Sequence, residues 1–156
     1  KLPLDDEVTL EELMQLLAQL VEDKLITSEV AKEINLNQIK VFYTSDLGRK
    51  VLKNKDKVKR ELPFAMIIPA GRLFSNVDND VEQPILVHGI IDGLIELDDE
   101  VIIFDYKTDH HTSEDKLIEN YRGQLNLYAM AVESMLNKKV SQKIIYSLDL
   151  GKSIVL

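Results

Sequence analysis

The chain has 156 residues, of which 45% are hydrophobic and 29% charged, with a formal net charge of −8 and no cysteine. This composition is that of a globular domain with its own core, and it excludes disulfides, thiolate-bound zinc, iron–sulfur clusters and a spanning helix, which needs about 20 apolar residues in a row. We therefore expect one cytoplasmic domain, residues 1–156, that stays out of the membrane. The negative charge argues against a broad basic surface that holds nucleic acid unaided. Any contact with DNA should therefore rely on other chains or a local patch.

Helical patterns open the chain. Residues 8–24 place apolar side chains at helical spacing, and Thr9 with Glu12 has the form of a capping box. A second, short helix is expected from Thr27 or Ser28 to about residue 34, and a third from Asn35 or Asn37 to about residue 53. Residues 1–54 therefore form a predicted helical segment.

Strand patterns follow in residues 55–156. Residues 58–68 predict a strand with an edge or a bulge near Pro63, and residues 75–83 predict an exposed polar loop. Residues 85–96 and 101–107 are nearly continuous apolar runs joined across residues 98–100, so we expect a hairpin of two strands that are covered on both faces.

The end of the chain returns to a helix and then to strands. Residues 115–136 have helical spacing, residues 142–150 resemble a strand, and a final short strand follows the turn at Gly151-Lys152. Three helices, three strands, a long helix and one or two strands indicate an α/β fold, with helices packed against a mixed central sheet. Residues 55–156 form the predicted sheet-plus-helix core.

Charged residues interrupt the two apolar runs. The pattern of an acid, any residue and lysine occurs three times, but only Asp105-Tyr106-Lys107 follows a strand-like run, and only this one has a second carboxylate, Asp92, in the preceding strand. Residues two apart on a strand face the same way, so Asp105 and Lys107 project together, and a hairpin can bring Asp92 alongside. Two adjacent carboxylates suit Mg²⁺, and a nearby lysine can orient or deprotonate an attacking water or offset charge on a phosphate. Together these residues predict phosphodiester hydrolysis.

Spacing alone is equally compatible with a simpler interpretation, in which Asp92 marks a bulge beside Gly93 and Asp105 pairs with Lys107 at a strand end. The next helix adds Tyr121, Gln124 and Tyr128, which share one face. That face suits contact with a phosphate backbone or support of metal ligands. The two tyrosines are equally typical of core residues with hydroxyls at the rim.

The segments "GIIDGLIELDDEVIIFDYKTD" and "YRGQLNLYAMAVE" resemble the RecB-like exonucleases of the PD-(D/E)XK superfamily. The resemblance is greatest to the C-terminal nuclease domain of the AddA (RexA) family, and "TLEELMQLLAQLVEDKLIT", "LGRKVLKN" and "RELPFAMIIPA" follow that family in the same order. It implies a restriction-endonuclease-like core and a Mg²⁺-dependent DNA exonuclease within an ATP-dependent helicase–nuclease that processes double-strand breaks. The implied partners are DNA, helicase domains of the same parent chain and a separate chain of the AddB/RexB type.

The resemblance also implies roles for individual residues. Asp92, Asp105 and the main-chain carbonyl of Tyr106 would bind Mg²⁺, for which Mn²⁺ or Ca²⁺ can substitute in binding. Lys107 would assist the attacking water. Gln124 and Tyr128 match the motif on the following helix, and Glu61 in "RELPF" matches a position adjacent to the site.

One feature of the family is missing. Its further metal ligand is a histidine in an upstream "GT..H" segment, and this chain begins where that segment would already have ended. His88, His110 and His111 do not match the position and are expected to be ordinary surface or turn residues. We therefore expect a fragment of a longer protein that binds metal weakly or is inactive alone. One alternative stays open, a silent nuclease-like module that docks DNA or another protein of the assembly. A restriction or repair endonuclease of the same superfamily fits the active site but not the long register from "LGRKVLKN" to "RELPF".

Overall fold

A computed structural model describes residues 8–73 and 83–156 of the chain. Four α-helices open it: α1 (Leu10–Glu22), α2 (Ser28–Glu33), α3 (Leu36–Thr44) and α4 (Asp46–Lys53). The predicted capping box is confirmed, since Thr9 Oγ1 accepts a hydrogen bond from the Glu12 amide at 3.2 Å and Glu12 Oε2 accepts one from the Thr9 amide at 2.8 Å. None of the helices in the described part of the chain has the length and apolarity that crossing a bilayer requires.

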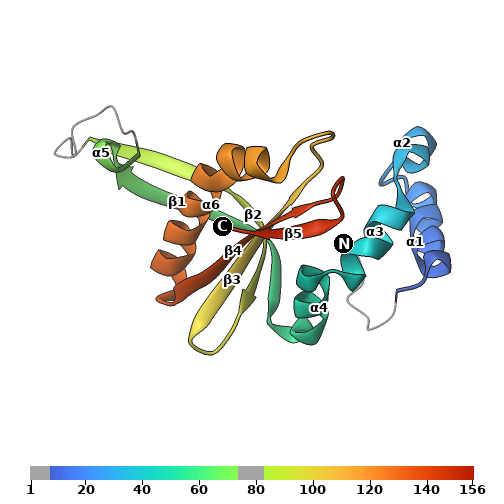
Figure 1. Cartoon of the computed structure of the whole chain (residues 1–156), viewed down its shortest axis with the longest axis horizontal. Helices are drawn as coiled ribbons and strands as arrows, with labels where there is room; N and C mark the ends of the chain where they lie inside the picture. The colour runs from blue at the N-terminus through green and yellow to red at the C-terminus, as the bar shows by residue number, and fades with distance from the viewer. Residues whose placement is uncertain (1–7, 74–82) are drawn as a thin grey trace.

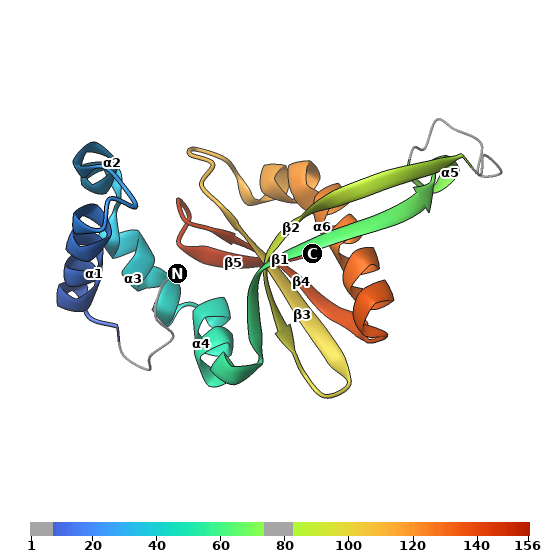
Figure 2. The same ribbon diagram turned by 180° about the vertical axis from the view of Figure 1, so that it is seen from behind.

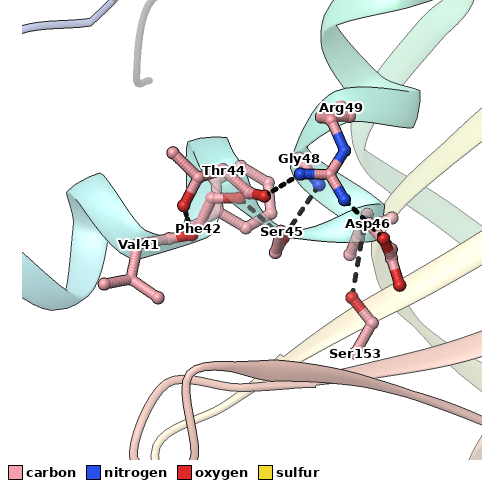
Figure 3. A network of polar contacts seen from close by, with 9 residues as sticks. Val41, Phe42, Thr44, Ser45, Asp46, Gly48, Arg49 and Ser153 are labelled. Atoms are coloured by element: carbon pink, nitrogen blue, oxygen red, sulfur yellow. Dashed lines mark hydrogen bonds and ion pairs between the residues drawn. The ribbon is translucent and has the colours of Figure 1, made fainter.

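The prediction of one continuous third helix is wrong, because the chain breaks at Ser45 (Figure 3). Ser45 is extended, and its hydroxyl accepts a hydrogen bond from the Gly48 amide at 3.0 Å while donating one to the Phe42 carbonyl at 2.6 Å. A Cβ on Gly48 would lie 1.9 Å from that carbonyl oxygen. The amide of Leu47 donates to Ser153 Oγ at 3.2 Å, which fastens α4 to the last strand. The break lets α4 turn onto the sheet.

The predicted mixed sheet is confirmed (Figure 1). Its strands are β1 (Val58–Pro69), β2 (Pro84–Glu96), β3 (Glu100–Lys107), β4 (Lys139–Ser147) and β5 (Lys152–Val155), in the spatial order β1-β2-β3-β4-β5. Neighbours are antiparallel except β3 and β4, which are parallel and are connected through the long helix α6 (Glu114–Leu136). A 3₁₀ turn, η1 (Lys55–Lys57), precedes β1.

Some predicted boundaries were wrong. The last long strand begins at Lys139 rather than 142 and ends at Ser147, because the Ser147 hydroxyl accepts from the Leu150 amide at 3.2 Å and starts a turn that Gly151 completes at φ +63°. The short helix α5 (Ala70–Leu73) was not predicted. The predicted loop 75–83 lies outside the described residues except for position 83.

Helices cover both faces of the sheet. One face packs against α6 through residues such as Ile103, Leu125 and Val132, and the other packs against α3 and α4 around Phe42 and Phe104. Strand β3 is buried on both faces, as predicted. The same prediction is wrong for residues 85–90 of β2, where burial alternates. There β1 and β2 form an arm that extends beyond the rest of the sheet (Figures 1 and 2).

The two strands of the arm, β1 and β2, exchange the faces of the sheet to which their side chains point, and they do so at one pair of opposed residues. Strand β1 is an edge strand, as predicted, but its irregularity lies at Glu61 rather than at Pro63 and shifts no register. Glu61 has φ +57°, and the pairing with β2 skips Glu61 and Asp92. Val58 lies on the face of α3 and α4, whereas Phe64, beyond the gap, lies on the face of α6. The strands therefore exchange faces at the position of Asp92.

Candidate active site

Asp105 lies near the end of β3 and is only 2% exposed. Its Oδ2 atom is 2.6 Å from the Lys107 ammonium, so the two side chains project together as their spacing predicts. This contact between the ammonium and Oδ2 lacks the geometry of a regular hydrogen bond. The buried Oδ2 atom accepts no hydrogen bond from the described residues. Asp105 is therefore a buried carboxylate that keeps acceptor capacity.

Asp92 lies where β2 separates from β3. The last paired residues of these strands are Gly93 and Phe104, so Asp92 is the next residue opposite Asp105 in the same register. In place of a further ladder bond, Asp92 Oδ2 accepts a hydrogen bond from the Tyr106 amide at 2.9 Å. The two aspartates thus occupy opposed positions where the strands separate, and the charge of Asp92 acts on Asp105.

The electrostatics of this pair favour a cation. Burial raises the pKa of Asp105, the contact with Lys107 lowers it, and the charge of Asp92 raises it again, with a net rise. Within the described ranges no three His, Asp or Glu side chains gather in a way that could hold a metal ion. Asp92 and Asp105 at opposed strand positions could supply two carboxylate ligands, and main-chain, water or phosphate oxygens would complete a coordination of the kind Mg²⁺ takes.

The backbone of Tyr106 faces this opening, while its side chain packs on the other face of the sheet. The N–H and C=O of a strand residue point to the same edge, so the carbonyl of Tyr106 is directed toward β2 like its amide. The ring lies edge-on to Phe42 at 5.4 Å between centroids. Burial and the charge of Asp92 raise the pKa of the phenol, which therefore stays neutral.

Lys107 is held on further sides by α6. Its ammonium donates to Gln124 Oε1 at 3.0 Å and lies 3.9 Å from the centre of the Tyr121 ring. The amide nitrogen of Gln124 donates to the Tyr128 hydroxyl at 2.6 Å, which fixes which end of the amide faces Lys107. The face predicted for Tyr121, Gln124 and Tyr128 is therefore turned toward Lys107.

A cavity of about 460 Å³ lies beside Asp92, between the sheet and α3. Arg60, Glu61, Asp92 and Tyr106 line it together with aromatic residues. Glu61 thus shares a cavity with Asp92. The sequence analysis does not single out Arg60, which lines this cavity directly before Glu61. It also does not single out Asp109, the last residue of the motif "DYKTD", which accepts a hydrogen bond from the Tyr121 hydroxyl at 2.9 Å.

The three histidines lie away from the carboxylate pair. His88 is exposed on the arm, where it pairs with Ala65. His110 Nδ1 lies 3.0 Å from Asp149, and His111 follows it at φ +55°. These are the surface and turn positions that the sequence predicts.

Known proteins resemble the chain over nearly its whole length. Residues 2–153 match the model of the PD-(D/E)XK nuclease superfamily. The chain is 39% identical over 155 residues to an ATP-dependent helicase/nuclease subunit from Listeria innocua, covering 94% of this chain and 12% of that protein. It is 40% identical over 153 residues to the protein of the same name from Enterococcus faecalis (95% and 12%) and 45% identical over 129 residues to that from Lactiplantibacillus plantarum (83% and 10%). The chain therefore spans about an eighth of the length of these relatives. With its mixed sheet and the family match over residues 2–153, the chain belongs to the PD-(D/E)XK nuclease superfamily.

Proposed function

We propose that this chain is the Mg²⁺-dependent DNA exonuclease module of an ATP-dependent helicase–nuclease that processes double-strand breaks for recombinational repair. The observation that carries the proposal is buried Asp105 paired with partly buried Lys107, opposite Asp92 at the point where two strands separate. The names of the relatives support the helicase–nuclease setting. The proposed ligands are all oxygen atoms, which supports a hard ion such as Mg²⁺.

In this proposal Asp92, Asp105 and the Tyr106 carbonyl would hold the metal, which when bound would supply Lewis acidity and activate a water for attack at neutral pH. Lys107 donates hydrogen bonds toward the attacking water or the phosphate oxygens, and its charge offsets the negative charge that builds during attack. Gln124 and Tyr128 keep the ammonium aimed at this point through two consecutive hydrogen bonds. Because the positions are preset by strands and a helix, little reorganisation is needed.

We further propose that DNA reaches this site with the help of other parts of the assembly, namely helicase domains of the same chain and a partner of the AddB/RexB type. The chain carries 27 acidic residues against 19 basic ones, so the long-range field of the module repels a polyanion. Delivery by motor domains would overcome that repulsion. The account predicts weak DNA binding by the isolated chain.

The test is degradation of linear DNA by the intact protein that carries this chain, with Mg²⁺ present. Asp105→Asn and Lys107→Ala should each abolish cleavage while ATP hydrolysis continues. Asp98→Asn is the matched control, because Asp98 is an exposed aspartate in the β2–β3 turn that pairs only with Lys57 at 2.8 Å among the described residues. Cleavage at the wild-type rate by an enzyme with both Asp105 and Lys107 replaced would refute the assignment and favour a silent docking module.

A further inference from the structure

Tyr121 joins the proposed site to a residue outside it. The Tyr121 hydroxyl lies 2.9 Å from both carboxylate oxygens of Asp109, and its ring faces the Lys107 ammonium at 3.9 Å. Burial and the contact with Asp109 raise the pKa of this phenol, so the hydroxyl stays protonated and donates. A chain of contacts thus runs from Asp109 through Tyr121 to Lys107.

We propose that Asp109 is a positioning residue for Lys107 and acts on it through the Tyr121 ring. The inference rests on the proposed function, because it assigns Lys107 to phosphodiester hydrolysis. Asp109 itself touches neither the reacting groups nor the carboxylate pair in this proposal. Asp109 instead fixes the position of the Lys107 ammonium.

The physical reason lies in the flexibility of lysine. An ammonium on a four-carbon stem is poorly localised unless several groups hold it. Asp105 is one such group, but its oxygens are also the proposed metal donors, so Gln124 and Tyr121 on α6 must hold Lys107 when Asp105 is engaged. A carboxylate that accepts from the phenol prevents the ring from turning away and makes its face more attractive to a cation.

The position of Asp109 could instead serve to anchor the loop that follows β3. That loop already has an anchor, since Asp149 lies 3.0 Å from His110 Nδ1 and accepts from the His111 amide at 3.1 Å. Asp109, by contrast, reaches α6. The two aspartates hold the same loop to different elements, which makes Asp149 a matched control for Asp109.

The kinetic test compares Asp109→Ala, Tyr121→Phe and the double variant in the intact protein with linear DNA and Mg²⁺. Each single change should lower kcat about tenfold, as loss of a supporting contact around a metal site commonly does, with KM for DNA unchanged. The double variant should be no slower than either single one, because both break the same link. Asp149→Ala should keep the wild-type kcat.

Three results would overturn the proposal: losses that add in the double variant, a wild-type kcat in Tyr121→Phe beside a loss in Asp109→Ala, or a loss in Asp149→Ala equal to that in Asp109→Ala. A second measurement needs no activity. In NMR spectra of the 156-residue chain, the Tyr121 ring current should shift the Lys107 ε-methylene signal upfield, and Asp109→Ala should move it back. A signal that does not respond to Asp109→Ala refutes the positioning role. If it responds while Lys107→Ala still cleaves DNA, the positioning contact stands and the proposed function fails.

Discussion

Replacing Lys107 with methionine tests the buried ion pair most sharply. The substitution keeps the length of the side chain and removes the cation that faces Asp105, which is 2% exposed. Removing one partner of a buried pair costs about 3–5 kcal/mol, since the other charge is left without compensation. A domain of this size loses roughly 2–4 °C in Tm per kcal/mol. We therefore expect Lys107→Met to lower Tm by about 6–20 °C at pH 8 without divalent cations.

The same loss should depend on pH in a defined direction. Burial already raises the pKa of Asp105, and removing Lys107 takes away a contact that lowers it. A carboxyl whose folded pKa is raised stabilises the fold below its unfolded pKa, about 3.9, and loses that contribution as pH rises through the folded value. The penalty of Lys107→Met should therefore be smaller at pH 5 than at pH 8. Adding Asp105→Asn should recover most of it, because replacing both partners removes the stranded charge.

The assays are thermal unfolding for Tm and urea unfolding for the free energy of unfolding, on the chain with EDTA at both pH values. Lys57→Met is the control, since Lys57 pairs with Asp98 at 2.8 Å with 45% and 90% of their side chains exposed, and such a pair is worth at most about 1 kcal/mol. An equal penalty at pH 5 and pH 8, or a double variant less stable than Lys107→Met, would refute the reasoning.

Further predictions concern the scaffold. In urea unfolding, Gly48→Ala should destabilise the chain by at least about 3 kcal/mol, because its Cβ would lie 1.9 Å from a backbone oxygen. Gly123→Ala on α6 should instead stabilise the chain by about 0.5–1 kcal/mol, because nothing lies within 4 Å of the added Cβ. If the two substitutions changed the free energy of unfolding equally, the close approach of Gly48 to Phe42 at the break would be contradicted. Hydrogen bonds from Lys138 and Lys59 lower the pKa of Glu96 to about 2, so Glu96 stabilises the fold above its unfolded pKa of about 4.3 and loses that contribution as pH falls toward 2. The stability difference between wild type and Glu96→Gln should therefore shrink from pH 6 to pH 2, and a constant difference would argue against it.

The parts of the site that local spacing controls could be predicted from the sequence. Asp105 and Lys107 share a side because strand residues alternate, and Gln124 and Tyr128 share a face because helix residues repeat. The hairpin turn then brings Asp92 opposite Asp105. Each of these relations spans a short stretch of chain.

Features that depend on contacts distant in sequence could not be predicted. The break at Ser45 follows from the close approach of Gly48 to a backbone carbonyl and from the docking of α4 on Ser153. The exchange of sheet faces by β1 at Glu61 needs a positive φ, which glutamate rarely adopts. The contact of Asp109 with Tyr121 depends on the path of a loop. No local periodicity encodes any of these.

The most direct test of the site is a crystal structure of the chain grown with Mn²⁺. The account predicts one anomalous peak between Asp92 and Asp105, within about 2.0–2.6 Å of an oxygen from each, with the Tyr106 carbonyl among the ligands. The peak should vanish in Asp105→Asn. Mn²⁺ bound elsewhere, or no peak at this position while the chain is folded and saturated with Mn²⁺, would contradict the account.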